Sequence, residues 1–414
     1  MRDTELYRHL LGLNEPWSVS RIELDIATQR VDVWAEHSKG IAWPCPVCQK
    51  RETLYDHSEE RAWRDLDSCQ FQTFLHARPP RVNCQEHGVR QVSLPWAEDN
   101  SRFTLLFERF AIDVLRHTSI QAARIILRIS WDEAWHLMDH AVKRGLAHKV
   151  PRNIPIIGVD EKSAGRGQSN YVTIVSDLER GVVEEVTEGR DSLSLETYFQ
   201  GLAPEQLAAV EAVSMDMSNS YISAVEKTWE NGRDKIVFDK FHLMGHVGKA
   251  VDTVRRREHL ALQGIGASLL TGTRYIWLYA RENLPMRYWD QFWRLRDSDL
   301  KTARAWAIKE EIRRLWNYQS QTWAEKHWKK WYFWATHSQL EPIKAAAKTL
   351  KNHLYGIMNF FKHRITNAMA EGINSRIETM WQAACGYRNK ARMRIAILFH
   401  FGDLDLYPVT HGEP

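Results

Sequence analysis

Three acidic residues stand where elements of secondary structure are expected to begin or end. Asp160 and Asp216 each close an apolar strand-like run, and Glu371 lies in a helical segment together with Asn367 and Asn374. At offsets of four and three, the last three residues share one face of that helix. Carboxylate and amide oxygens suit Mg²⁺ or Mn²⁺. Two such ions can hold the attacking and leaving oxygens of an in-line phosphoryl displacement, so the pattern indicates phosphoryl transfer.

The elements around these residues support the hypothesis through their order. Strands are expected at Ile154–Asp160, Ser169–Asp177, Val182–Glu188, the end of 207–216 and Lys235–Asp239, and helices at Leu193–Leu202 and from Ser218. This is the order of a ribonuclease H-like fold, in which the carboxylates of the first and fourth strands lie side by side. A single Asp at a strand end is usually a turn or cap residue, so the hypothesis depends on all three acidic residues occurring in this order.

Two short motifs near the N-terminus predict a zinc site. Cys45 and Cys48 are spaced by two residues, as are Cys84 and His87, and 35 residues separate the two pairs. Each pair on a tight turn supplies two ligands, so together they complete a tetrahedron around one Zn²⁺. No position remains for water, which indicates a structural ion. We expect the other two cysteines, Cys69 and Cys385, to be ordinary core residues.

Residues 118–142 have the pattern of a helix-turn-helix. A helix through Gln121–Leu127 is followed by a turn at 128–130, where Ser130 and Glu133 can form a capping box for the next helix. The expected contact between the two helices is between these apolar residues: Ala122, Ile125, Ile126 and Ile129 against Ala134, Leu137, Met138 and Val142. The second helix would enter the major groove of DNA. We expect Arg124, Arg128 and Trp131 to contact DNA, although helical hairpins also occur in proteins that bind none.

Composition and charge narrow the class of protein. The 414 residues are 44% hydrophobic and 26% charged, which is typical of globular domains and excludes disordered and fibrous chains. Nothing resembles a signal peptide or a membrane span, so a cytoplasmic protein is expected. Residues 151–240 carry nine basic and sixteen acidic side chains, whereas residues 241–414 carry 27 basic and fifteen acidic ones. An acidic metal-collecting centre beside a polyanion-binding surface would explain this contrast, and so would chance.

The segment from 242 to about 360 is predicted to be helical, basic and rich in tryptophan. Nine of the 18 tryptophans fall between Trp277 and Trp334, and most of these are expected to pack in the core of a helical bundle. The basic residues that we expect to contact phosphate groups are Arg255, Arg256, Arg257, Lys362 and Arg364.

These motifs together resemble the bacterial insertion-sequence transposases of the DDE type, specifically the ISL-three family. The matching motifs, in order, are CPVC, CQEH, GVDE at 158–161, SMDMSNSY at 214–221, FDKFH at 238–242 and TNAMAEGIN at 366–374. The resemblance implies a catalytic triad of Asp160, Asp216 and Glu371. Asp239 and His242 resemble the (C/D)-x-x-H motif of related transposases. In those families the motif supports the active site downstream of the second aspartate. Asp239 also competes with Asp216 as second metal ligand, and we prefer Asp216 because it ends the fourth strand.

The predicted molecule is therefore a multidomain α+β protein. It has a zinc-binding domain at 1–100, a helix-turn-helix at 101–150, a ribonuclease H-like α/β catalytic domain at 151–242 and 361–414, and an all-helical insertion at 243–360. The implied activity is binding of terminal inverted repeats, followed by strand cleavage and strand transfer with two Mg²⁺ or Mn²⁺ ions per site. The implied DNA partner is double-stranded and includes both the transposon ends and the target. Further copies of the chain are implied in a dimer or larger assembly, and no membrane is involved. The implied location is the bacterial cytoplasm, in association with the nucleoid. The alternatives are a DNA-binding protein derived from a transposase that no longer cuts and a structure-selective nuclease of the same fold.

Overall fold

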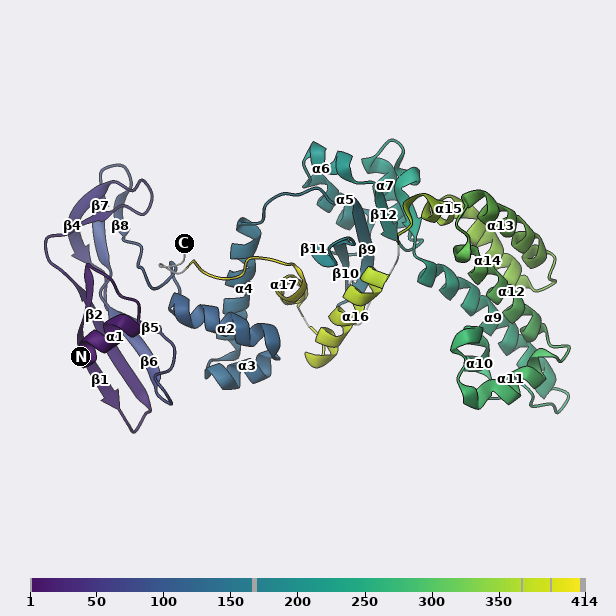
Figure 1. The fold of residues 1–414 in the computed structure, drawn as a ribbon, viewed down its shortest axis with the longest axis horizontal. Helices are drawn as coiled ribbons and strands as arrows, with labels where there is room; N and C mark the ends of the chain where they lie inside the picture. Colours follow the sequence, from purple (N-terminus) through teal and green to yellow (C-terminus); the bar gives the residue numbers. More distant parts are fainter. Residues whose placement is uncertain (1, 166–169, 366–367, 388, 410–414) are drawn as a thin grey trace. The chain divides into compact units, whose positions relative to one another are not determined.

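The computed structural model describes residues 2–165, 170–365, 368–387 and 389–409. The chain divides into two compact units (Figure 1). One contains the residues up to Lys149 together with those from Leu404, and the other contains Val150–Asp403. No helix in the described ranges is both long enough and apolar enough to cross a bilayer.

The first unit begins with a short helix and two four-stranded sheets. The helix is α1 (Asp3–Leu10), one sheet has the order β1-β2-β6-β5, and the other has the order β3-β4-β7-β8. The strands are β1 (Trp17–Asp25), β2 (Arg30–His37), β3 (Ala42–Pro44), β4 (Arg51–His57), β5 (Arg61–Arg64), β6 (Gln72–Ala77), β7 (Pro80–Cys84) and β8 (Gly88–Gln91). Buried tryptophans form much of their core, with the rings of Trp17 and Trp96 in edge contact at 4.6 Å.

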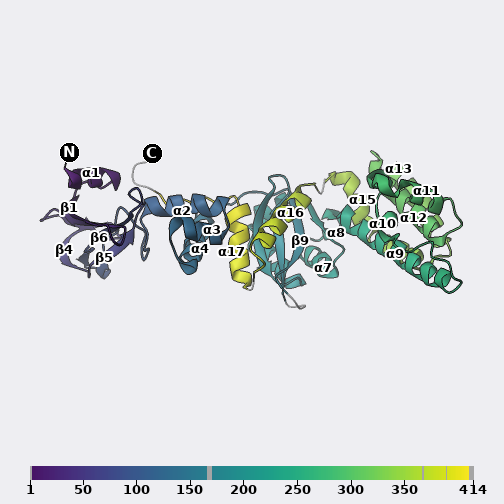
Figure 2. The ribbon, with the colours of Figure 1, turned by 90° about the horizontal axis from the view of Figure 1, so that it is seen from below.

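Three helices follow, and they confirm the predicted helix-turn-helix. They are α2 (Leu105–His117), α3 (Ile120–Leu127) and α4 (Trp131–Ala147) (Figure 2). Ser119 caps α3, and the capping box of Ser130 with Glu133 is present in both directions. The predicted packing face of α3 is wrong, because Ile125 and Ile126 are 65% and 55% exposed. The buried α3 residues are instead Ala123 and Leu127, one turn apart.

The end of the chain belongs to this first unit. The Arg144 guanidinium donates to the Leu406 carbonyl at 2.5 Å, and the Tyr407 hydroxyl donates to Asp113 at 2.6 Å. Leu406 itself is buried. The structure therefore groups residues from Leu404 onward with the helix-turn-helix, whereas the sequence assigned everything from 361 to 414 to the catalytic domain.

The second unit is built on a five-stranded sheet of order β11-β10-β9-β12-β13, which confirms the ribonuclease H-like arrangement. Its strands are β9 (Ile156–Ser163), β10 (Tyr171–Asp177), β11 (Val182–Glu188), β12 (Ala212–Met215) and β13 (Ile236–Phe238). The first three form an antiparallel meander, and β12 runs parallel to both β9 and β13. Asp160 was expected to end the first strand, but β9 continues through Ser163 because its last residues pair with β10.

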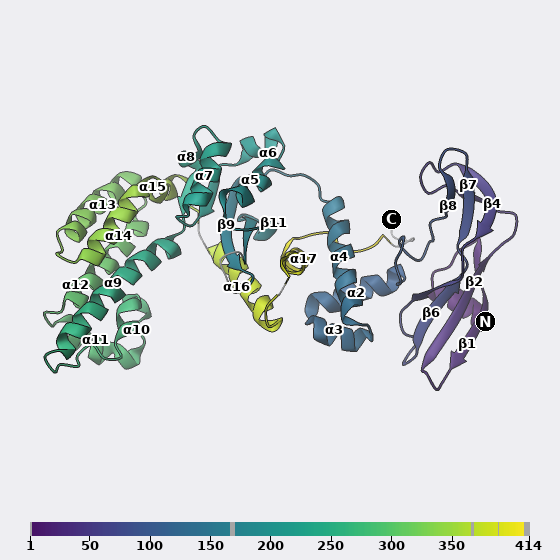
Figure 3. The ribbon, with the colours of Figure 1, turned by 180° about the vertical axis from the view of Figure 1, so that it is seen from behind.

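Helices cover both faces of this sheet. In Figures 1 and 3, α5 (Ser192–Gln200) and α7 (Asn219–Thr228) lie on one side, and α16 (Ala368–Ala383) and α17 (Lys390–Phe401) lie on the other. Two short helices, α6 (Pro204–Ala209) and α8 (Gly232–Lys235), complete this part. Alternation along β9 separates the two layers. Ile157 and Val159 join the core under α5 and α7, whereas Ile156 packs against a separate small cluster that Ala370 of α16 also contacts.

The predicted insertion is a helical bundle. It comprises α9 (Lys240–Gln263), α10 (Arg274–Leu278), α11 (Trp289–Arg296), α12 (Lys301–Arg313), α13 (Gln321–Thr336), α14 (Glu341–Asn352) and α15 (Leu354–His363), with the 3₁₀ turns η1 (Arg281–Asn283), η2 (Met286–Tyr288) and η3 (Arg314–Asn317). Six of the nine tryptophans between Trp277 and Trp334 are buried or partly buried in its core, as expected. The exposed ones are Trp289, Trp323 and Trp334.

Candidate functional site

The sheet register brings three aspartates into one row. Ser214 of β12 is paired with Gly158 of β9, and Met215 is paired with Phe238 of β13. Continuing these parallel registers places Asp216 beside Asp160 on one side and beside Asp239 on the other. Neighbouring strands lie about 4.8 Å apart, so Asp216 is the central carboxylate of the three.

All three aspartates line one small pocket, together with His242 from the first turn of α9. Asp216 and Asp239 each also accept a local backbone N–H, from Ser218 at 2.9 Å and from Phe241 at 2.6 Å. These are the ordinary turn and cap contacts of an Asp at a strand end. They hold each carboxylate in place while both residues still line the same pocket. Burial raises the pKa of Asp160, and the carboxylates of Asp216 and Asp239 act in the same direction.

Helix α16 reaches this pocket through Ala370 and Asn374, one turn apart. The Asn374 amide donates to Oδ2 of Asp160 at 2.5 Å, and the Glu161 N–H donates to Oδ1 at 2.8 Å. Glu371 follows Ala370 directly but is exposed, and its charge acts on Lys240 at the start of α9. The expected helix face is therefore represented at the pocket by Asn374, while Asn367 lies outside the described residues.

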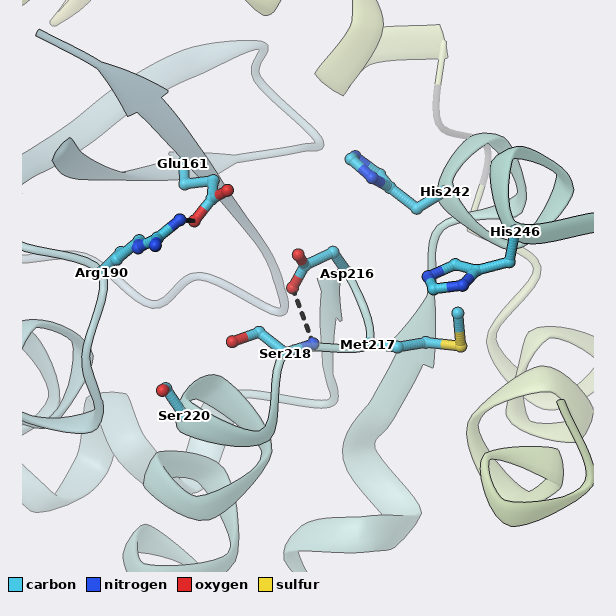
Figure 4. A pocket seen from close by; sticks show the side chains of 8 residues that line it. All are labelled: Glu161, Arg190, Asp216, Met217, Ser218, Ser220, His242 and His246. Atoms are coloured by element: carbon cyan, nitrogen blue, oxygen red, sulfur yellow. Dashed lines mark hydrogen bonds and ion pairs between the residues drawn. The ribbon is translucent and has the colours of Figure 1, made fainter. Parts of the chain in front are cut away.

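A larger cavity of about 410 Å³ opens beside the aspartates. Figure 4 shows Asp216 near its centre, with Glu161 and Arg190 on one side and His242 and His246 on the other. Arg190 lies 3.8 Å from the Glu161 carboxylate and stacks over the Tyr171 ring. Sequence reasoning missed Arg190 and His246. His246 follows His242 at an offset of four, which could have identified it, but Arg190 lies in a loop with no motif around it.

The four predicted zinc ligands form a compact cluster. Their ligand atoms all lie within 4.8 Å of one another, and Cys48 Sγ is 3.7 Å from Cys84 Sγ. Ligands about 2.3 Å from a tetrahedral zinc are roughly 3.8 Å apart, so the spacing fits the ion. The N–H groups of Cys48 and Val47 point at Cys45 and lower the pKa of its thiol to about 7, which favours the thiolate form that binds metal.

The two remaining cysteines contradict the expectation that they are core residues. Cys69 and Cys385 are both exposed. Each has a positive φ, 59° and 53°, which indicates tight turns at the surface.

The basic residues expected to contact DNA differ in their availability. Trp131 is 41% exposed at the first position of α4, and Arg124 donates to Gln121 within α3. Arg128 has a left-handed backbone and is held by Asp67 and by the Gln70 carbonyl. These contacts attach the turn of the helix-turn-helix to the β-domain.

Among the basic residues of the second unit, Arg255 departs from expectation. It is buried and paired with Asp252 on its own helix at 2.7 Å, so it stabilises α9 and is not a surface phosphate contact. The neighbouring Arg256 and Arg257 are exposed, as is Lys362. Arg364 is exposed and donates to the Tyr318 carbonyl at 3.2 Å.

The two candidate metal centres differ in their completeness. The cysteine and histidine cluster supplies four soft or borderline donors, as Zn²⁺ requires. The aspartate row supplies hard oxygen donors suited to Mg²⁺ or Mn²⁺. Within the described part of the chain, however, no set of three carboxylates is as compact as the zinc cluster.

Comparison with known proteins agrees with this architecture. Residues 157–397 match the DDE model of the ISL3 family, described as a transposase, residues 41–87 match the zinc finger of transposases IS204/IS1001/IS1096/IS1165, and residues 92–142 match the helix-turn-helix domain of transposase family ISL3. The chain is 26% identical to the transposase for insertion sequence element IS1557 of Mycobacterium tuberculosis, over 100% of this chain and 99% of that protein. It is 25% identical to the transposase for IS1001 of Bordetella parapertussis, over 84% and 86%. Since the catalytic-domain match alone spans more than half of the sequence, the chain belongs to the ISL3 family of DDE transposases.

Proposed function

We propose that this transposase binds the terminal inverted repeats of its insertion sequence. It then cleaves and joins DNA strands in a catalytic site formed by Asp160, Asp216 and Glu371. The observation that carries the proposal is the row of aspartates on β9, β12 and β13, over which α16 lays Asn374. Glu371 belongs to the same turn of α16 as Ala370 and Asn374, which line the pocket. To reach the aspartate row, the Glu371 carboxylate would need this helix to rearrange, and the proposal includes that step.

Two Mg²⁺ or Mn²⁺ ions, held by Asp160, Asp216 and Glu371, would supply positive charge beside the attacking and leaving oxygens. Asn374 fixes the orientation of the Asp160 carboxylate. Asp216 is preferred over Asp239 as the second ligand because it is the direct neighbour of Asp160 in the register. Asp239 caps α9 and so holds His242 beside the same pocket, where the imidazole can contact the scissile phosphate.

The nucleophile in cleavage is water, and the bond to the 3′-oxygen of the DNA breaks to leave a 3′-hydroxyl. That hydroxyl then attacks a phosphate of the target strand, and a target 3′-oxygen leaves. Both steps exchange one P–O bond for another, so neither needs an oxidant or a covalent link to the protein. The cavity lined by Arg190 and His246 beside Asp216 provides room for the DNA strand and nitrogen donors that can contact its phosphates.

We assign sequence recognition to residues 1–150, with one structural Zn²⁺ in the domain at 1–100 and α4 in the major groove. Trp131 is the first residue of α4 and Arg124 lies on α3, and both can reach DNA, while Arg128 orients the turn between the two helices. Arg256, Arg257 and Lys362 are exposed candidates for phosphate contacts in the second unit. Joining two transposon ends to one target requires two or more copies of the chain. The protein would act on DNA in the bacterial nucleoid.

The decisive experiment is a magnesium-dependent cleavage assay on DNA that carries the element's own end. Glu371→Gln removes a charge but little volume, so it should abolish cutting and leave end binding within a few-fold of the wild type. Glu230→Gln, which changes an exposed glutamate elsewhere in the same unit, is the control and should cut normally. End binding without cutting by the wild type would favour the alternative, a silent DNA-binding derivative, and equal loss of binding and cutting in Glu371→Gln would refute its catalytic role.

A further inference from the structure

A second cavity, of about 470 Å³, lies in the first unit where the β-domain meets the helix-turn-helix. Five arginines line it, from strands β2 and β5 and from the loops that flank the helices: Arg30, Arg61, Arg64, Arg102 and Arg128. Glu133 is the acidic residue in its wall, and its carboxylate already accepts from the N–H and hydroxyl of Ser130 at 2.8 Å. The cavity is therefore a concentration of positive charge.

Three of the five arginines already have carboxylate partners. Arg30 forms a bidentate contact with Asp32, and both Arg64 and Arg128 pair with Asp67. These pairs hold the guanidinium groups in place and partly neutralise them. They build the frame of the site and leave the other two arginines to supply its net charge.

Arg61 and Arg102 are not neutralised in this way. Arg61 donates to the Ser101 carbonyl at 3.1 Å and lies over the Trp63 ring, and Arg102 is exposed. Within the described ranges, neither forms an ion pair with a carboxylate. Two guanidinium groups with unused N–H donors face the same cavity, which is the arrangement that recognises a phosphate group.

Arg64 provides an independent sign of a missing acceptor. It is only 6% exposed, and its Nε has no hydrogen-bond partner in the described structure. Buried N–H groups of this kind are nearly always paired, with the protein, with water or with a bound ion. An anion in the cavity would supply an acceptor for it.

The position of the cavity identifies the anion. Its wall includes Ile129 and Glu133, from the turn before α4 and from the first turn of α4. A group bound here lies beside the end of the helix that is assigned to the major groove. Backbone phosphates flank that groove on both sides, and contacts to them set the register of a recognition helix.

We propose that this arginine pocket binds a backbone phosphate of the duplex next to the base pairs that α4 reads. The inference rests on the proposed function, because it assumes that α4 enters DNA. The contact is sequence-independent, so it contributes affinity and register, while the side chains of α4 contribute specificity.

The test compares Arg61→Gln/Arg102→Gln with the control Arg21→Gln/Arg90→Gln, which removes the same charge from exposed arginines elsewhere in the β-domain. Fluorescence anisotropy measures binding to the element end and to a scrambled duplex between about 50 and about 300 mM salt. We expect the pocket variant to bind both duplexes about tenfold or more weakly, with the end preference retained and the salt slope reduced by about one to two. The control should keep a slope close to that of the wild type.

Two results would overturn the proposal: an unchanged salt slope in the pocket variant, with or without loss of end preference, or an equal reduction of the slope in the control. Arg102→Gln alone serves as a second variant if the double variant loses zinc or melts early, because Arg102 is exposed. Inorganic phosphate without DNA is a separate arm, and a thermal shift that depends on the two arginines at low millimolar phosphate would show a free-anion site instead. If the wild type has no end preference, the proposed function fails, yet the salt slope on scrambled DNA still tests the pocket.

Discussion

The zinc cluster and the aspartate row are the two proposed metal sites, but they are assembled in different ways. The zinc ligands come from two tight turns of one small β-domain, and their four ligand atoms are already close together. The aspartates come from three parallel strands, and the glutamate that completes the proposed triad comes from a helix after the bundle insertion, where it is exposed. A structural metal needs a closed set of ligands, whereas a catalytic metal site must also admit its substrate.

Removing a zinc ligand should have the largest effect, because that site holds a domain together. Structural zinc contributes about 10 kcal/mol or more to the folding of small zinc domains, so Cys84→Ser should unfold the β-domain and abolish DNA binding. Zinc content should fall from one ion per chain to nearly none, and calorimetry should show loss of one unfolding transition while that of the catalytic unit remains. Cys69→Ser changes an exposed cysteine outside the cluster and should leave both measurements unchanged. Full zinc occupancy in Cys84→Ser would contradict the assignment of this ligand.

The next largest effect is expected on the cleavage rate when the second metal ligand is replaced, and it distinguishes Asp216 from Asp239. As the central carboxylate beside Asp160, Asp216 should hold metal, so Asp216→Asn should slow cleavage by about 10³-fold or more, which corresponds to roughly 4 kcal/mol. Asp239→Asn removes a helix cap and a neighbouring charge and should slow cleavage by about ten- to a hundredfold. Cleavage rates of both variants over a range of Mn²⁺ and Mg²⁺ concentrations make the comparison. The reverse order of effects would move the second ligand to Asp239.

Much of the fold could be predicted from the sequence because its signals are local. The sheet order follows from apolar runs, the helix-turn-helix from the Ser130 capping box, and the zinc cluster from two spacings. A strand end is less local: β9 runs past Asp160 through polar residues because β10 pairs with them. The apolar stripe of α3 was misjudged because Ile125 and Ile126 look like core residues, while the smaller Ala123 is the one that packs.

The charged residues show the same limit more clearly. Arg255 belongs to a basic run whose sequence suggests phosphate contacts. Its partner Asp252 lies one turn earlier on the same helix, however, and both side chains are largely buried. Arg61, Arg102 and Arg190 carry no motif, and only the tertiary structure gathers them at cavities. Local patterns thus predict the zinc site almost completely and the catalytic site only in outline.

The hydrogen bond from Asn374 to Asp160 gives the smallest and most specific test, because it links α16 to the sheet. Asn374→Ala leaves every proposed metal ligand in place but frees the Asp160 carboxylate, so we expect cleavage about tenfold slower with end binding unchanged. Ser375→Ala, on the exposed side of the same helix, is the matched control and should cut at the wild-type rate. Asn374→Asp should be worse than Asn374→Ala, because it sets a fourth carboxylate against Asp160 where the amide donated a hydrogen bond. If Asn374→Ala cut as fast as the wild type, the hydrogen bond would have no role in catalysis. It would then no longer support the proposal that α16 brings Glu371 to the aspartate row.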